Sequence, residues 1–157
     1  MIANPSMREE IKSAFSRVKG LYKKDVISPT RVTREKYDII ICDETHKLRR
    51  KENLITYADS FKKANERLGL DNTYDELDWI LMQSKYQVLF YDKKQCVSPS
   101  DIRDDDAERR LYDRNMGVRP IELKRQMRVK SGRSYVPYIY DVLYQKAKVK
   151  KFFLIMT

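Results

Sequence analysis

Two adjacent carboxylates, Asp43 and Glu44, follow the apolar run Ile39–Cys42. A run of β-branched residues without alternation is typical of a strand covered on both faces, as in a parallel sheet. Ligands of such sheets gather beyond the carboxyl ends of the strands. There an Asp can hold hydrated Mg²⁺ on phosphate oxygens, and the next Glu can orient or deprotonate an attacking water. The pattern therefore favours nucleotide hydrolysis, with Thr45 and His46 facing the γ-phosphate.

Two other readings of the acidic pair stay open. The carboxylates can simply cap the helix that follows the strand. Together with Asp92 they can also serve as the metal ligands of a nuclease. Zinc is not expected, because two cysteines and one histidine lack the number and spacing of a four-ligand site.

Further motifs follow in a fixed order along the chain. A second apolar run, Val88–Tyr91, leads into Asp92-Lys93-Lys94-Gln95, and Glu122–Arg128 ends in Q-x-R. With D-E-T-H at 43–46, these segments resemble the second, third and fourth motifs of superfamily 1 helicases. From about Asn4 to Leu143 the chain is similar to a helicase-like ATP-binding family of bacteria and phages that is related to the ATPase part of Schlafen proteins.

The resemblance implies a fold, two cofactors and a set of roles. The fold would be α/β, a RecA-like P-loop NTPase with a parallel sheet flanked by helices, and the cofactors would be ATP and Mg²⁺. Asp43 would hold the metal and Glu44 would be the base. Gln95 and Arg128 would act at the γ-phosphate, while His46 and Gln126 would contact the nucleotide.

One part of that fold is missing from the sequence. A phosphate loop needs G-x-x-x-x-G-K-[S/T], and none of the four glycines, Gly20, Gly69, Gly117 and Gly132, is followed by Lys-Ser or Lys-Thr. We therefore expect a partial fold without its first strand and loop: a nucleotide-binding core over 1–116 and the start of a second core region over 117–157. We expect an internal piece of a longer protein, inactive alone, with the loop supplied by the rest of that protein or by a complementing chain.

Positive charge is concentrated near the C-terminus. Residues 117–151 hold ten Lys and Arg against Glu122 and Asp141, a net charge of +8. Interleaved tyrosines fit a track for nucleic-acid phosphates and stacked bases. The candidate contacts are Lys124, Arg125, Lys130, Arg133, Lys146, Lys148 and Lys150. Two alternatives remain, a solvated helix with a tyrosine-bearing core face and a non-catalytic remnant that binds nucleic acid or a protein.

The rest of the sequence predicts alternating helices and strands in a cytoplasmic protein. Cys42 and Cys96 are expected to be reduced, and no apolar stretch approaches the length of a membrane span. Apolar residues at three- and four-residue spacings predict helices. These helices cover Met7–Val18, Asn53–Leu68 with a stop at Gly69, Tyr74–Met82, Asp101–Asn115 and Ser134–Lys148.

Overall fold

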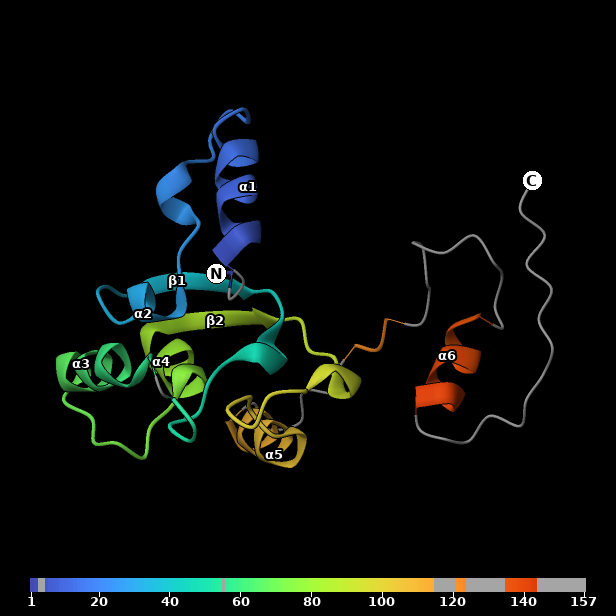
Figure 1. The fold of residues 1–157 in the computed structure, drawn as a ribbon. Coiled ribbons are helices and arrows are strands. Elements are labelled where there is room, and N and C mark those ends of the chain that lie inside the picture. Colours follow the sequence, from blue (N-terminus) through green and yellow to red (C-terminus); the bar gives the residue numbers. More distant parts are fainter. Residues whose placement is uncertain (3–4, 55, 115–120, 124–134, 144–157) are drawn as a thin grey trace. The chain divides into compact units, whose positions relative to one another are not determined.

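A computed structural model describes residues 1–2, 5–54, 56–114, 121–123 and 135–143 of the chain (Figure 1). The chain divides into two compact units, Met1–Val118 and Arg119–Thr157. The first unit holds both strands of the small sheet and the helices around it, and the second holds the helix α6 (Tyr135–Leu143). The mixture of helices with a parallel strand pair agrees with the predicted α/β class.

The sheet pairs two strands that are far apart in the sequence. β1 (Tyr37–Cys42) and β2 (Ser84–Leu89) run parallel, with Tyr37 opposite Ser84 and Cys42 opposite Leu89. This parallel pairing agrees with the parallel sheet that the apolar run Ile39–Cys42 predicted. β2 begins earlier than the predicted strand at Val88, because helix α4 (Glu76–Gln83) passes into it without a loop.

The start of the chain lies along the other edge of β1. The Met1 nitrogen donates to the Ile41 carbonyl, and the Asp43 N–H donates to the Met1 carbonyl at 3.2 Å. Ile2 forms an isolated parallel bridge with Asp43. Successive carbonyls of a strand point to opposite edges, and the Cys42 carbonyl accepts the Phe90 N–H beyond the end of β2. Met1 and Ile2 thus lie on the edge of β1 that faces away from β2.

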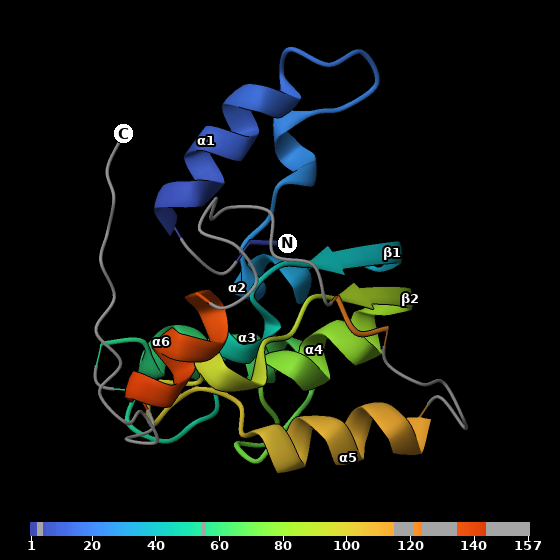
Figure 2. The same cartoon turned by 90° about the vertical axis from the view of Figure 1, so that its right-hand side faces the viewer.

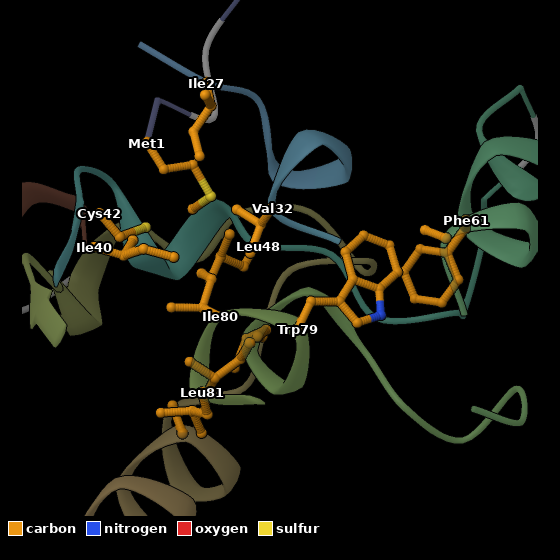
Figure 3. Packing of buried hydrophobic residues seen from close by; sticks show 14 residues of the cluster. Met1, Ile27, Val32, Ile40, Cys42, Leu48, Phe61, Trp79, Ile80 and Leu81 are labelled. Carbon is orange, nitrogen blue, oxygen red and sulfur yellow. The ribbon is translucent and has the colours of Figure 1, made fainter. Parts of the chain in front are cut away.

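One face of the strand pair is packed against helices. Ile40 and Cys42 are buried in a core that includes Val32 of α2 (Pro29–Val32) and Ile80 of α4. Figure 2 shows α2 and α4 on one side of the two strands. Figure 3 shows the indole of Trp79 beside the ring of Phe61, with ring centroids 4.9 Å apart.

The other face of the strands is open, contrary to the prediction that the strand is covered on both faces. Ile39 is 59% exposed and Ile41 56% exposed, and Tyr86 and Val88 of β2 are exposed beside them. The unbroken apolar run correctly indicates a strand. It does not indicate how many layers cover the strand, since Ile40 and Cys42 belong to the core while Ile39 and Ile41 stay exposed.

The end of α3 and the start of α4 have well-defined caps. Gly69 ends α3 (Ala58–Leu68), as predicted, in the left-handed conformation at φ 68°. The Asp75 side chain caps α4 by accepting the N–H groups of Leu77 and Asp78. Arg110 of α5 (Asp104–Arg114) donates to both oxygens of Asp75 at 2.9 and 2.8 Å, which fastens α5 to the start of α4.

The remaining described elements are short or lie near the predicted positions. α1 covers Pro5–Phe15, so the predicted helix Met7–Val18 is shifted toward the N-terminus. No helix of the described residues is long and apolar enough to cross a membrane. The part of the first unit that the structure describes also contains the 3₁₀ turns η1 (Lys23–Asp25), η2 (Thr45–Lys47) and η3 (Lys93–Gln95).

Candidate functional site

The D-E-T-H segment leaves β1 in a tight turn that is fixed to the end of β2. The Thr45 N–H donates to the Phe90 carbonyl at 2.8 Å, and the Phe90 N–H donates to the Cys42 carbonyl at 3.0 Å. Asp43 Oδ1 accepts the Glu44 N–H at 3.0 Å. The turn is tight enough to put Glu44 in the left-handed region, at φ 56° and ψ 45°.

That backbone conformation is unusual for a residue with a long side chain. A left-handed residue other than Gly, Asn or Asp costs roughly 1–2 kcal/mol. Such conformations cluster at functional sites, where the surrounding structure holds them in place. At Glu44 the holding contacts are the paired main-chain bonds of Thr45 and Phe90 on one side and of Asp43 with Met1 on the other.

A chain of polar contacts links the D-E-T-H turn to the segment after β2. His46 Nδ1 accepts the Asp92 N–H at 3.2 Å, and Gln95 Nε2 donates to Asp92 Oδ2 at 2.7 Å. On its other side, His46 Nε2 lies 2.8 Å from Glu44 Oε2. Glu44, His46, Asp92 and Gln95 therefore lie beyond the same ends of the two strands. We call these four residues the strand-end network.

His46 is the buried centre of the strand-end network. Its side chain is 3% exposed, and its ring stands edge-on to Tyr91 with centroids 6.0 Å apart. Because Nδ1 accepts a hydrogen bond, the proton of the neutral ring is on Nε2, which faces Glu44. The 2.8 Å approach of Nε2 to Glu44 Oε2 lies outside hydrogen-bond geometry.

Glu44 is held in its ionised form. Lys47 Nζ lies 2.9 Å from Glu44 Oε2 and is the main reason that the pKa of Glu44 falls below its usual value. Partial burial opposes this effect, and His46 adds to it. A carboxylate at this place can accept a proton or orient a water molecule. The position of Lys47 three residues after Glu44 was the one sequence signal that could have indicated this pairing.

A second anchor fixes the exit of the D-E-T-H segment. Glu76, at the start of α4, is fully buried. Its Oε2 accepts the Arg49 N–H at 2.9 Å and its Oε1 accepts the Tyr57 hydroxyl at 2.8 Å. Burial is the main reason that the pKa of Glu76 rises to about 7. Glu76 could not be recognised from the sequence, since a Glu in the first turn of a helix is ordinarily exposed.

The candidate metal ligands at the strand ends are Asp43, Glu44, His46 and Asp92. No group of three or more His, Cys, Asp or Glu residues with the geometry of a metal site occurs within the described part of the chain. This is compatible with Mg²⁺ at a nucleotide, because that ion typically takes one or two carboxylates and completes its shell with phosphates and water.

The other predicted site residues lie outside the described residues. They are Gln126 and Arg128 of the Q-x-R motif and the basic residues Lys124, Arg125, Lys130, Arg133, Lys146, Lys148 and Lys150. The proposed roles of these side chains therefore remain predictions from the sequence.

Comparison with known proteins agrees with the order of the motifs. The profile of the Schlafen group 3 DNA/RNA helicase domain matches residues 2–154, which is nearly the whole chain. Searches of the curated proteins and of the solved structures found no match. The chain therefore belongs to the Schlafen group 3 helicase-domain family.

Proposed function

We propose that this chain is part of a helicase-like nucleoside triphosphatase that acts on nucleic acid, and that the strand-end network responds to the nucleotide. The observation that carries this proposal is the unbroken contact path from Glu44 through His46 and Asp92 to Gln95. The fold we propose is RecA-like, with β1 and β2 as neighbouring strands and the strand of the phosphate loop not included in this chain.

The proposed roles follow from position and chemistry. Asp43 would supply one carboxylate ligand to Mg²⁺, and the ionised Glu44 would orient or deprotonate the attacking water. Gln95 would detect the γ-phosphate, and a change in its position would reach Glu44 through Asp92 and His46. Bound Mg²⁺ would offset phosphate charge in this chemistry. For Gln126 and Arg128 we keep the roles that the family resemblance implies, contact with the nucleotide and action at the γ-phosphate.

The chain alone should bind ATP weakly and hydrolyse it negligibly. It lacks the glycine-rich loop, so the main-chain N–H groups and the Lys that hold the phosphates are missing. Turnover well above that of a Glu44→Gln variant would contradict this expectation. It would also mean that another group of the chain holds the phosphates.

Binding can be tested without turnover by titrating the labelled chain with MgATP and following amide NMR shifts. The shifts should concentrate on His46, Gln95 and their neighbours. Asp43→Asn should weaken the magnesium-dependent part of the response. Asp59→Asn, which removes an exposed acid in the first turn of α3, is the matched control and should leave the response unchanged. No shift at the strand ends, or equal effects of the two variants, would refute the proposal.

A nucleic-acid partner is supported by the family match and by the charge of residues 117–151. We propose that Lys146, Lys148 and Lys150 contact the strand's phosphates. Their joint replacement by Gln should then flatten the dependence of log affinity on log salt by up to about 2, at roughly 0.7 for each contact on single strands. An unchanged slope in a folded variant would identify these lysines as a solvated face.

A further inference from the structure

A basic cleft lies between α2 and α3, away from the strand-end network. It has a volume of about 280 Å³, and its lining is made of Lys, Arg, Ser and Thr side chains without an acid or an aromatic ring. The four cations are Arg31, Arg34, Lys63 and Arg67. Ser28, Thr30 and Ser60 complete the lining of the cleft. We call this site the α2–α3 cleft.

Local structure explains why these side chains converge. Ser60, Lys63 and Arg67 recur at three- and four-residue spacings, so they share one face of α3. Arg67 Nη1 donates to Thr33 Oγ1 at 2.6 Å, which holds its guanidinium against the end of α2. Thr33 is itself buried, and its hydroxyl donates to the Thr30 carbonyl at 3.0 Å. One wall of the cleft is therefore fixed.

The positive charge of the cleft is not neutralised by the described part of the chain. None of the ion pairs found there includes Arg31, Arg34, Lys63 or Arg67. The acids nearest in sequence have other contacts: Glu66 pairs with Lys62, and Glu35 accepts the Tyr37 hydroxyl. Four like charges around one hollow repel one another, and a bound anion would relieve that repulsion.

The shape and lining of the cleft indicate which anion it takes. Its volume is just below the usual range of small-molecule pockets, about 300–1,000 Å³. No aromatic side chain is present to stack on a base. Arg31, Arg34 and Lys63 are exposed, so the remainder of a long ligand can stay in solvent. These properties fit one or two phosphates of a polymer better than a whole nucleotide.

We propose that the α2–α3 cleft binds backbone phosphates of a single nucleic-acid strand. α2 ends shortly before β1 begins, and Figure 1 shows α2 and α3 near the ends of the strands opposite to η2. The α2–α3 cleft is thus a second site, separate from the strand-end network. The choice of nucleic acid as the ligand rests on the proposed function, whereas the affinity for phosphate rests on the cleft alone.

The test measures binding of a labelled oligothymidylate to the whole chain by fluorescence anisotropy over a series of salt concentrations. The triple variant Arg31→Gln, Arg34→Gln, Lys63→Gln removes three cations of the cleft and leaves Arg67 with its structural bond. If all three contact phosphates, the slope of log affinity against log salt should fall by about 2.

The matched control removes the same charge elsewhere in the first unit, at Lys19, Lys23 and Lys24. These three residues are exposed and lie around η1. Their replacement by Gln should leave the slope within error of the unmodified chain. Equal slopes for the two triple variants would overturn the proposal, because binding would then follow total charge. Circular dichroism of both variants verifies that they fold.

A second measurement needs no variant and separates a strand from free phosphate. Oligothymidylate should shift the amide signals of residues 28–34 and 60–67, and inorganic phosphate at the same phosphate concentration should shift them much less. Shifts with inorganic phosphate alone would overturn the assignment to a nucleic-acid strand. Asp43→Asn should leave these shifts unchanged, so failure of the nucleotide site and failure of the cleft give different results.

Discussion

Replacing Glu76 by Gln should remove a pH dependence of folding that the buried carboxyl creates. Glu76 has a pKa of about 7 in the folded chain against its usual 4.5, chiefly because it is fully buried. The folded state therefore binds the proton more tightly than the unfolded state. The resulting stabilisation is fully present below pH 4.5 and is lost as the pH rises through 7.

The size of the effect follows from the two pKa values. Each pH unit between them corresponds to about 1.36 kcal/mol, so the free energy of unfolding should fall by about 3 kcal/mol between pH 4.5 and pH 8 on account of Glu76. Gln does not titrate, and its amide can accept the Arg49 N–H and donate to the Tyr57 hydroxyl. The free energy of unfolding of the variant should therefore lack the fall that Glu76 causes. The other titrating groups contribute equally to the pH dependence of both chains.

The assay is urea unfolding at a series of pH values. Trp79, the one tryptophan of the chain, reports on the core through its fluorescence. Glu66→Gln, at an exposed acid of α3, is the control. Its free energy of unfolding should depend on pH in the same way as that of the unmodified chain. If the free energy of unfolding of Glu76→Gln depends on pH in the same way as that of the unmodified chain, the carboxyl does not change its protonation on folding. The reasoning from burial would then be wrong.

Two further substitutions test the packing of the first unit. Trp79→Phe removes the donor to Asn65 Oδ1, a buried hydrogen bond of 2.6 Å. Urea unfolding followed by circular dichroism should show that the free energy of unfolding falls by at least about 2 kcal/mol. A fall below about 0.5 kcal/mol would contradict a stabilising role for this hydrogen bond. Arg110→Met leaves the buried Asp75 without its bidentate partner and should cost about 3 kcal/mol, while Arg109→Met, at an exposed pair, should cost little. Equal losses for these two variants would show that α5 is not fastened through Arg110.

The sequence predicted the strand-end elements well because the local signals there were strong. An apolar run followed by D-E-T-H indicates a strand with acids at its carboxyl end, and the parallel pairing of β1 with β2 brings Gln95 to the same end. Gly69 was likewise a reliable stop for α3, since the left-handed conformation at a helix end favours glycine.

Features that depend on tertiary contacts were not predictable in this way. The first residues of β2, Ser84–Gln87, are largely polar and carry no strand signal, and they become a strand by pairing with Tyr37–Ile40. The open face of β1 depends on which helices are present to cover it. The α2–α3 cleft is formed by two segments that lie about 30 residues apart in the sequence. The chain has 33 Lys and Arg residues, and the sequence did not distinguish the four cations of the cleft from the others.

The conformation of Glu44 has a consequence for which residues this position tolerates. Its φ of 56° suits Gly or Asn, whereas the general base that we propose at this position requires a carboxylate. Backbone and chemistry therefore select opposite residues at position 44. In a library screened for thermal stability alone, Gly and Asn would displace Glu, and only a screen for nucleotide turnover in the complete protein would keep it. Among related proteins, a Glu at this position would then indicate that the site is still used for catalysis, and a Gly or Asn would indicate that it is not.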